Sequence, residues 1–428
     1  MLGMDITLFP ATVLGTVSVP SSKSQTIRAL LLSSFSRSHC LIKNPLLSRD
    51  TQSCIDVCKA LGARLKVSDS LIEVDSADLG KGLEEVTLDC GNSATTMLLA
   101  TPLVASLGIR ATFTGDESLL SRPVGPLLRA LSALGAKVEA KDPELPPYTI
   151  EGPLKGGKAT IFCKTSQYLS GLLMGCPLAQ GACILDVPLL YEKPYVRITE
   201  DYLKAFGAVY SRQSDLQRFE IPGSQAFKAA DIRINGDFSS ASFFFCAAAI
   251  TGSRVTVKGL DSHDPQGDKG ILRILTAMGC KVSWKADQVT VSAGPRLLGG
   301  TFDLNAMPDT LPALAVTACY ASEPVNLINV PQARLKETDR IAVMQKALSS
   351  MGASISELND GLAIRPAGPL SGGRVNSLKD HRIAMAFAIA SLRCKTDLTI
   401  EDAQVVDITY PSFFKTLESI KEVHNADN

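Results

Sequence analysis

A Gly-Ala dipeptide or a close relative of it recurs at almost constant spacing, and this repeat constrains the fold more than any other feature of the chain. Each glycine follows an apolar residue and precedes a stretch of alternating apolar and polar residues. Successive glycines are 72 or 73 residues apart, at Gly62, Gly135, Gly207, Gly279 and Gly352. Glycine at such a junction is typical of a helix C-terminus that leads into a strand. The sequence therefore predicts repeated units of helix and strand.

A second series of residues has the same period and predicts the number of units. Polar residues open six apolar segments that we expect to be helices, at Ser24, Thr95, Ser166, Ser239, Thr310 and Arg382. A unit of about 72 residues is longer than the repeats of solenoids and propellers, whose periods are roughly 20 to 50 residues. We therefore expect six compact α/β modules (α+β repeats), each with helices and a mostly covered sheet.

The N-terminal segment is predicted to complete the last module. A sixth Gly-Ala signal would fall near residue 424, where the chain stops, whereas residues 5–19 have a strand-like pattern and no helix of their own. Pairing of that segment with the last unit makes one domain discontinuous. The predicted domains are residues 1–19 with 236–428, and residues 20–235, each with three units.

Composition narrows the classes of function. The 428 residues are 45% hydrophobic and 20% charged, as in globular domains, and 43 basic residues balance 43 acidic ones. That balance gives no general reason to expect nucleic acid or an anionic membrane as partner. The longest apolar runs, 241–250 and 311–320, are shorter than the roughly 20 residues of a membrane span, and no targeting signal opens the chain. We expect a cytoplasmic monomer that binds small-molecule substrates.

The cysteines predict neither disulfides nor a metal site. There are eleven, an odd number, mostly inside apolar runs and without a Cys-x-x-Cys pair, as expected of buried, reduced thiols. Cys54 and Cys58 are four residues apart on a predicted helix, but no second pair or nearby histidine completes a metal site. We predict no metal and no cofactor.

Basic residues gather near the predicted helix starts. Helix energetics favour an acidic residue at that end, so a cation there suggests an anionic ligand. If the helix starts converge, these cations face a cleft between the domains and bind phosphates and carboxylates without metal. Asp309 and Glu337 are the only acids among them, which makes them the candidates for proton transfer. The cations come from both halves of the chain: Lys23, Arg28, Arg122, Lys336, Arg340 and Arg382.

Each of these segments also has a plain structural interpretation. Lys23 and Arg28 could be solvated side chains of a capped helix, and Asp309 could be an ordinary N-cap. Lys336 and Arg340, four residues apart, could belong to a salt-bridged surface helix. Thr165 and Ser166 could be simple caps, and the small polar turn 91–96 taken singly is a weak signal of a ligand close to the backbone.

Together these segments resemble the EPSP synthase family, the 3-phosphoshikimate 1-carboxyvinyltransferases, over nearly the whole chain. The residues that carry the resemblance include Lys23-Ser24 with Arg28, Gly91-Asn92, Ser121-Arg122-Pro123, Ser166-Gln167, Lys193-Pro194-Tyr195, Gly236-Asp237, Pro308-Asp309, Lys336-Glu337-Thr338-Asp339-Arg340 and Asp380-His381-Arg382. The resemblance implies an inside-out α/β barrel of two domains, each with three βαβαββ units.

The resemblance also implies a reaction in the shikimate pathway, towards chorismate and the aromatic amino acids. The enolpyruvyl group of phosphoenolpyruvate would pass to the 5-hydroxyl of shikimate 3-phosphate by addition and elimination, with release of phosphate. Asp309 would take the hydroxyl proton, Glu337 would deliver a proton to the methylene carbon, and Lys23 would be the third catalytic residue.

The substrate-binding residues implied by the resemblance fall into two sets. Shikimate 3-phosphate would be held by Lys23, Ser24, Arg28, Thr165, Ser166, Gln167 and Lys336. Phosphoenolpyruvate would be held by Lys23, Arg122, Arg340 and Arg382, and its approach would pass Asn92 and Ala94. Gln332 would also contact substrate.

Several positions depart from the family pattern and put substrate affinity in question more than the reaction. Leu98 stands where many members have arginine, Glu192 where a phosphate-binding serine is common, Gln332 where asparagine is frequent, and Ile408 where some have lysine. Glu192 is the largest departure, because a carboxylate repels a substrate phosphate unless it is protonated or turned away. Ala94 replaces a common glycine, a change associated in the family with tolerance of glyphosate.

Two alternatives remain at this level. UDP-N-acetylglucosamine 1-carboxyvinyltransferases share the fold and phosphoenolpyruvate, but they usually carry a reactive cysteine ahead of an Arg-Pro pair, and residues 115–123 contain none. In that family the lysine that corresponds to Lys23 is followed by asparagine, whereas Lys23 is followed by Ser24. A non-catalytic sensor of a phosphorylated metabolite is the other alternative, and the presence of both Asp309 and Glu337 argues against it.

Overall fold

The computed structural model of the chain describes residues 3–422, so the position near residue 424 where a sixth Gly-Ala signal would fall lies outside the described residues. The chain divides into two compact units. Unit 1 contains the N-terminal residues up to Pro20 and the segment from Asn235 onward, and unit 2 contains Ser21–Ile234.

Unit 2 contains three sheets with one topology, in which two parallel strands are followed by an antiparallel pair. In sheet order their strands are β14 (Ile232–Arg233), β3 (His39–Lys43), β5 (Leu71–Asp75) and β4 (Arg64–Val67); β6 (Glu85–Asp89), β7 (Arg110–Thr114), β9 (Tyr148–Glu151) and β8 (Lys137–Ala140); and β10 (Gly157–Cys163), β11 (Cys183–Leu190), β13 (Arg218–Ile221) and β12 (Ser211–Arg212).

Unit 1 repeats this topology in two of its three sheets, and among the described residues its third sheet has one antiparallel strand in place of the pair. In sheet order their strands are β16 (Lys281–Lys285), β17 (Gln288–Ser292), β15 (Arg254–Lys258), β2 (Thr12–Ser18) and β24 (Lys421–Glu422); β18 (Gly300–Asp303), β19 (Val325–Ile328), β21 (Gly361–Arg365) and β20 (Ser354–Leu358); and β22 (Gly373–Asn376), β23 (Leu398–Glu401) and β1 (Ile6–Leu8). The six modules expected from the repeat are confirmed.

The N-terminal segment divides its pairing between two modules. Strand β1 pairs antiparallel with β23 of the last module, as predicted. Strand β2 also agrees with the prediction in part, because it pairs antiparallel with β24 at the C-terminal end of the last unit. Its parallel pairing with β15 of the fourth module was not predicted. Val13 and Val17 of β2 lie in the core with Val255 and Val257 of β15. The sequence pattern shows that β2 has an apolar face but not which sheet that face will cover.

The helices form a buried set and a more exposed set. The buried helices are α1 (Lys23–Phe35), α3 (Ala94–Ala105), α6 (Ser166–Gly175), α8 (Phe238–Thr251), α10 (Leu311–Ala318) and α12 (His381–Ser391); each begins within one residue of its predicted start. The others are α2 (Arg49–Ala60), α4 (Glu117–Leu120), α5 (Gly125–Ala133), α7 (Lys193–Ala205), α9 (Ile271–Ala277), α11 (Arg340–Ser350) and α13 (Phe413–Glu418). The 3-10 helices are η1 (Cys176–Leu178), η2 (Gly267–Gly270), η3 (Pro308–Thr310), η4 (Pro331–Leu335) and η5 (Ala403–Ile408).

The repeated glycines end the helices as predicted. Each follows α2, α5, α7, α9 or α11 and has a positive φ, between 75° and 97°. This left-handed conformation costs a residue with a Cβ free energy, which explains why glycine recurs at these five junctions.

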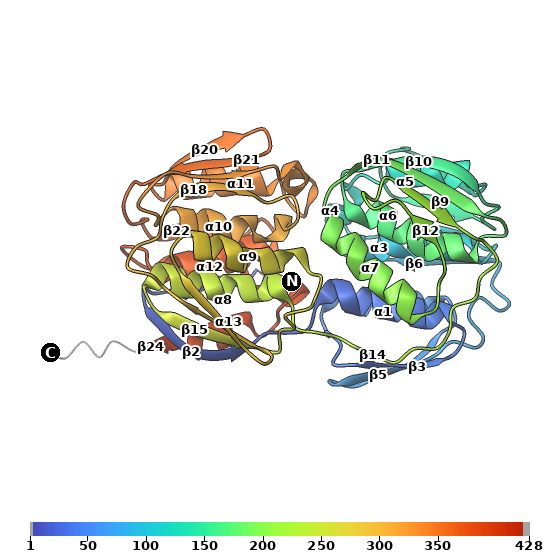
Figure 1. Cartoon of the computed structure of the whole chain (residues 1–428), viewed down its shortest axis with the longest axis horizontal. Coiled ribbons are helices and arrows are strands. Elements are labelled where there is room, and N and C mark those ends of the chain that lie inside the picture. The colour runs from blue at the N-terminus through green and yellow to red at the C-terminus, as the bar shows by residue number, and fades with distance from the viewer. Residues whose placement is uncertain (1–2, 423–428) are drawn as a thin grey trace. The chain divides into compact units, whose positions relative to one another are not determined.

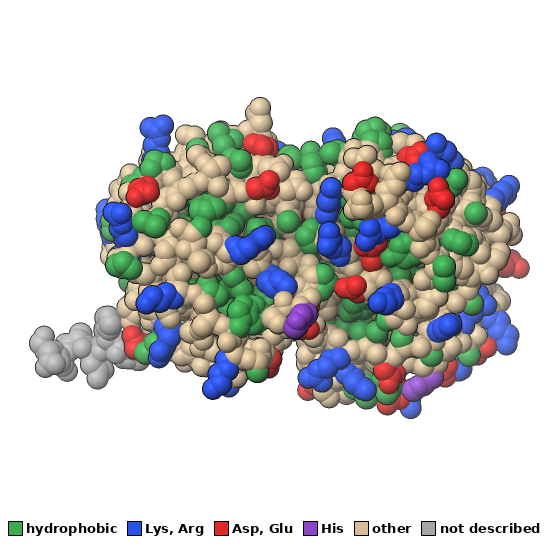
Figure 2. Space-filling view, viewed as in Figure 1, with side chains coloured by type: hydrophobic (Ala, Val, Ile, Leu, Met, Phe, Trp, Pro, Cys, Tyr) green, Lys and Arg blue, Asp and Glu red, His purple; other side chains and the backbone are tan. Residues whose placement is uncertain are grey.

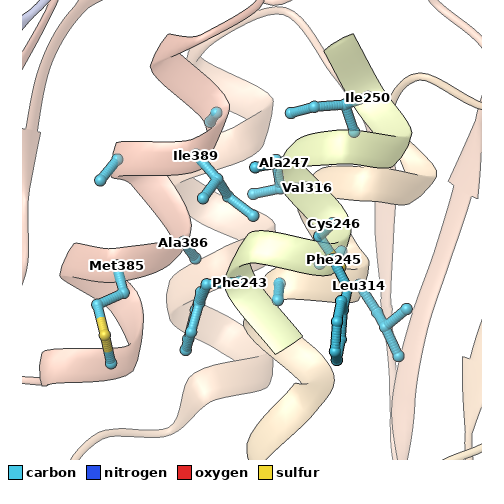
Figure 3. Packing of buried hydrophobic residues seen from close by; sticks show 14 of the residues in the cluster. Phe243, Phe245, Cys246, Ala247, Ile250, Leu314, Val316, Met385, Ala386 and Ile389 are labelled. Carbon is cyan, nitrogen blue, oxygen red and sulfur yellow. The ribbon is translucent and has the colours of Figure 1, made fainter. Parts of the chain in front are cut away.

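The buried helices lie inside each unit and the sheets lie around them. In unit 1, α8, α10 and α12 run between the sheet that contains β2 and β15 and the sheet that contains β18, β20 and β21 (Figure 1). Side chains of α8 such as Phe245 and Ile250 pack with Leu314 of α10 and Ile389 of α12 in one apolar core (Figure 3). Helices that are apolar on all sides require this position.

Two glycines set the distance between α3 and α6 in unit 2. A Cβ at Gly171 would lie 2.3 Å from the carbonyl oxygen of Leu98, and one at Gly175 would lie 2.5 Å from that of Pro102. Since both contacts are with backbone, the two helices can approach this closely only with glycine there. The close packing holds the N-terminus of α6 beside that of α3, where Gln167 Nε2 donates to Thr95 Oγ1 at 3.0 Å.

The surface and the helix lengths agree with the composition. Figure 2 shows basic and acidic side chains interspersed over the viewed face, with hydrophobic side chains in small separate areas. None of the helices between residues 3 and 422 has both the length and the hydrophobicity that crossing a membrane requires.

Candidate active site

Arg340 is the centre of a charged cluster in unit 1. It is the first residue of α11, and only 1% of its side chain is exposed. Its Nε donates to Asp380 Oδ2 at 2.8 Å, Nη1 to Asp309 Oδ1 at 2.8 Å, and Nη2 to Glu337 Oε2 at 2.7 Å. Burial alone would lower the pKa of Arg340, but Asp380, Glu337 and Asp309 raise it, so the guanidinium stays charged. One cation thereby fixes both predicted proton-transfer residues.

Asp309 carries its negative charge among three cations. Its Oδ2 lies 3.0 Å from Arg382 Nη2, and its Oδ1 contacts Arg340 and lies 3.9 Å from Lys336 Nζ. Burial alone would raise the pKa of this carboxyl, but Arg382, Lys336 and Arg340 together hold the pKa well below its usual value. Asp309 is therefore ionised at neutral pH.

Arg382 has guanidinium donors that the described residues leave without acceptors. Only 4% of the residue is exposed, and its Nη2 contacts Asp309, whereas Nε and Nη1 have no hydrogen-bond partner between residues 3 and 422. A buried donor without an acceptor costs free energy. Acceptor oxygens of a bound anion would satisfy these donors through charge-assisted hydrogen bonds.

The structural interpretations proposed for this part of the sequence are wrong. Lys336 is extended at the end of η4, and α11 begins only at Arg340, because Asp339 caps it by accepting from the backbone N–H of Ala342. The segment is thus no continuous surface helix. Asp309 lies within η3, and the residue before α10 is Thr310, so its carboxylate faces cations and caps no helix.

Gln332 lies close to this cluster in sequence but is tied to another loop. Its Nε2 donates to the carbonyl oxygen of Asn305 at 2.9 Å, while its buried Oε1 has no hydrogen-bond partner in the part of the chain that the structure describes. The residue is 1% exposed. The amide is therefore held through Nε2, and Oε1 is available to accept a hydrogen bond.

In unit 2, Arg28 is buried and tied to three helices. Its Nη1 donates to Ser24 Oγ at 2.5 Å, Nε to Thr199 Oγ1 at 2.8 Å, and Nη2 to Ser170 Oγ at 3.3 Å. Burial lowers the pKa of Arg28 to about 10, against the opposing charges of neighbours that include Glu192. The interpretation of Arg28 as a solvated side chain is therefore wrong, and the predicted shared face with Ser24 is confirmed.

Lys23 is the first residue of α1 and is paired with an acid of α2. Its Nζ lies 2.8 Å from Asp50 Oδ2; the lysine side chain is 17% exposed and the aspartate 4%. The other carboxylate oxygen, Asp50 Oδ1, is buried without a hydrogen-bond partner among the described residues. Asp50 therefore both neutralises and positions this cation.

The remaining predicted residues of unit 2 form short polar chains at helix N-termini. Arg122 Nη2 donates to Asn92 Oδ1 at 3.2 Å, and Asn92 Nδ2 donates to Asp116 Oδ2 at 2.9 Å. Ala94, the half-buried first residue of α3, follows two positions after Asn92. The structure thus brings Arg122 and Asn92 into direct contact beside Ala94.

Thr165 and Ser166 open α6 as expected, but their partner is an acid. Thr165 caps the helix, and both hydroxyls donate to Oε2 of Glu192, at 3.3 Å from Thr165 and 2.9 Å from Ser166. Glu192 is therefore turned towards these residues.

Sequence reasoning missed the acids that hold the cations. Asp380 was part of a motif without an assigned role, and Asp50 carried no signal beyond its place near a helix start.

Two of the departures from the family pattern have a simple structural explanation, because Leu98 and Ile408 are buried in the hydrophobic cores. All eleven cysteines are buried and free. Over residues 3–422 there is no group of three or more His, Cys, Asp or Glu side chains that could hold a metal.

Comparisons with known proteins agree with one another. The model of the EPSP synthase (3-phosphoshikimate 1-carboxyvinyltransferase) family matches residues 9–417. A 3-phosphoshikimate 1-carboxyvinyltransferase of Ruminiclostridium cellulolyticum is 41% identical over 406 residues, which are 95% of this chain and 96% of the relative. One of Methanocella arvoryzae is 39% identical over 409 residues, or 95% and 96% of the two chains. The solved structure of EPSP synthase from Acinetobacter baumannii has the same fold, with a TM-score of 0.82 at 24% identity over 97% of this chain and 98% of that one.

Proposed function

The chain belongs to the EPSP synthase family, the 3-phosphoshikimate 1-carboxyvinyltransferases, and we propose how its own residues carry out that reaction. The reaction transfers the enolpyruvyl group of phosphoenolpyruvate to the 5-hydroxyl of shikimate 3-phosphate and releases phosphate, in the shikimate pathway. The reaction has two steps: the 5-oxygen adds to C2 while a proton adds to C3, and then the C2–O bond to the phosphate breaks while C3 loses a proton.

The observation that carries the proposal is the arrangement around Arg382. Two buried donors of Arg382 have no acceptor among residues 3–422, and they lie beside Arg340, Lys336 and an ionised Asp309. Such a cluster binds an anion strongly and keeps a carboxylate within reach of it. We assign phosphoenolpyruvate to Arg340 and Arg382, with Lys23 and Arg122 contributing from unit 2.

Binding of the anion would prepare Asp309 to act as a base. In the free chain three cations hold the pKa of Asp309 far below neutrality, which makes its carboxylate a weak base. The carboxylate and phosphate of phosphoenolpyruvate would neutralise Arg340 and Arg382, and the pKa of Asp309 would then rise towards its usual value. Asp309 would accept the proton of the 5-hydroxyl only when both substrates are present.

Glu337 would deliver the proton to C3. Its carboxylate is held 2.7 Å from Arg340 Nη2 on one side, with 10% of the side chain exposed. Sharing Arg340 with Asp309 couples the two acids, because a proton gained by one changes the charge felt by the other. This arrangement suits a pair that takes a proton from oxygen and gives one to carbon in the same step.

Residues of unit 2 would hold shikimate 3-phosphate. We assign its ring and phosphate to Lys23, Ser24, Arg28, Thr165, Ser166 and Gln167, with Lys336 of unit 1 neutralising the phosphate. Gln332, Asn92 and Ala94 complete the proposed contacts.

The domain bounds, the oligomeric state and the location of the protein are also proposals. We propose that the domains are residues 1–19 with 236–428 and residues 20–235, and that the protein acts as a monomer in the cytoplasm without metal or nucleic acid. The division of the chain at Pro20 and Asn235 supports the domain bounds, and the balance of charges gives no reason to expect nucleic acid as a partner.

The test is phosphate release from phosphoenolpyruvate. Release should require shikimate 3-phosphate and persist in excess chelator. Activity that appears only with a UDP-sugar would overturn the proposal, and so would activity that chelator abolishes and added metal restores.

A further inference from the structure

The side chain of Glu192 lies at the N-terminus of a helix other than its own. Glu192 immediately precedes α7, yet its carboxylate makes no capping bond to that helix. Instead its Oε2 accepts three hydrogen bonds at the start of α6, from the backbone N–H of Ser166 at 3.1 Å, from Ser166 Oγ at 2.9 Å and from Thr165 Oγ1 at 3.3 Å. Only 2% of the residue is exposed.

These three donors make a site that suits any oxyanion. The backbone N–H and two hydroxyls converge where the dipole of α6 already favours negative charge. Phosphate oxygens form the same charge-assisted hydrogen bonds as a carboxylate oxygen. The chain therefore places one of its own anions where the proposed function places the phosphate of shikimate 3-phosphate.

The backbone of Glu192 has an unfavourable conformation, which indicates that the contacts of its side chain hold the residue in place. Its φ is 56°, in the left-handed region that glutamate rarely adopts. Arg28, whose guanidinium is hydrogen-bonded to Ser24, Thr199 and Ser170, lies close enough to interact electrostatically with Glu192. The carboxylate thus supplies an internal counter-ion as long as no ligand does.

We propose that Glu192 is a specificity-determining residue whose carboxylate occupies the place of the substrate phosphate at α6 and competes with it. This inference rests on the proposed function. A phosphate cannot share the three donors with the carboxylate, because two anions at that distance repel each other. Glu192 must turn away when shikimate 3-phosphate binds, and the lost contacts lower the affinity for phosphate-bearing ligands only.

The experiment measures equilibrium binding of two ligands, shikimate 3-phosphate and unphosphorylated shikimate. The variants are Glu192→Ser, which removes the anion and leaves a hydroxyl, and Glu192→Gln, which keeps the shape and removes the charge. The matched control is Glu220→Gln, which removes one negative charge from an exposed position on β13. Thermal unfolding of every variant shows whether it is folded.

We expect Glu192→Ser to bind shikimate 3-phosphate roughly 10- to 100-fold more tightly than the wild type, the range expected when a charge-assisted hydrogen-bond network no longer has to be displaced. Glu192→Gln should show a smaller gain. Binding of shikimate should change less than about 3-fold, and Glu220→Gln should match the wild type for both ligands. A tenfold change in affinity corresponds to about 1.4 kcal/mol.

Unchanged or weaker binding of shikimate 3-phosphate by both folded Glu192 variants would overturn the inference. An equal gain for shikimate would also overturn it, because competition would then not concern the phosphate. Turnover of the wild type, measured on the same preparation, separates the two proposals: a wild type that releases phosphate while the variants show no gain contradicts only the role of Glu192, whereas a wild type without turnover contradicts the proposed function.

Discussion

Asp309 and Arg382 form an ion pair in which Arg382 Nη2 lies 3.0 Å from Asp309 Oδ2, while two other nitrogens of the same guanidinium have no acceptor among the described residues. The pair joins a candidate base to a candidate anion-binding group. It comes from two helix starts that are about one repeat apart in sequence, at residues 309 and 382.

The first prediction concerns Asp309→Asn. The amide cannot accept the proton of the 5-hydroxyl, so kcat should fall by roughly 10² to 10⁴. Binding of shikimate 3-phosphate should change little, because its proposed ligands are mostly in unit 2. Steady-state kinetics and equilibrium binding check this, with Asp287→Asn in an exposed turn as the control. Near-normal turnover by the variant would rule out the assignment of the base.

The second prediction concerns pH and stability. The cations hold the pKa of Asp309 in the folded chain below its usual value of about 3.9 in an unfolded chain. A depressed pKa contributes stability above the unfolded value, and that contribution is lost as pH falls towards the folded one. The difference in free energy of unfolding between wild type and Asp309→Asn should be constant from pH 5 to 8 and shrink below about pH 4. Urea unfolding measures it; a difference that grows on acidification would contradict the charge assignment.

The third prediction concerns Ala94 and glyphosate. Ala94 begins α3 two residues after Asn92, and its methyl group narrows the proposed site for phosphoenolpyruvate by one carbon. Crowding by one methyl in a packed site costs roughly 1 to 3 kcal/mol, and glyphosate, which is longer, should lose more affinity than the substrate. Ala94→Gly should therefore strengthen glyphosate inhibition by roughly 5- to 100-fold with a smaller change in KM for phosphoenolpyruvate. Equal inhibition constants in the two proteins would show that residue 94 does not determine the response.

The fourth prediction concerns the packing of α3 against α6. A Cβ at Gly171 would lie 2.3 Å from the backbone oxygen of Leu98, so Gly171→Ala should force the helices apart. We expect a net loss of about 1 to 3 kcal/mol in the free energy of unfolding, despite the higher helix propensity of alanine. Ser132→Ala on the exposed side of α5 is the control and should stay within about 0.5 kcal/mol of the wild type. A stabilised Gly171→Ala would mean that the helices do not approach so closely.

The sequence predicted the repeating part of the fold well, because its signals are local. A glycine with positive φ ends each of five helices, and an apolar run defines each buried one, so both can be seen without knowing the neighbours. Strand β2 shows the limit. Its valines indicate a buried face, yet only the folded chain shows that β2 joins the sheet of β15 as well as pairing with β24 near the C-terminus.

The candidate site was predictable as a set of cations but not as a network. The charges at the helix starts singled out Arg340 and Arg382, since cations are unfavourable there without an anion. The partners were not predictable: Asp380 and Asp50 are distant in sequence from the cations they hold, and Glu192 stood out only as an unexpected acid. Pairing between residues of different helices and loops depends on tertiary packing, which a local pattern does not encode.

If Asp309 is the base and Glu337 the acid, a hydrogen atom from solvent must be transferred to C3 of phosphoenolpyruvate, and a single measurement tests this transfer. If Glu337 protonates C3 of phosphoenolpyruvate, C3 becomes a methyl group in the intermediate and then loses a proton, so hydrogen from solvent enters the product. With phosphoenolpyruvate and shikimate 3-phosphate in heavy water, mass spectrometry should find deuterium in the enolpyruvyl methylene of the wild-type product. Product that forms at a normal rate without deuterium would contradict addition and elimination at this site.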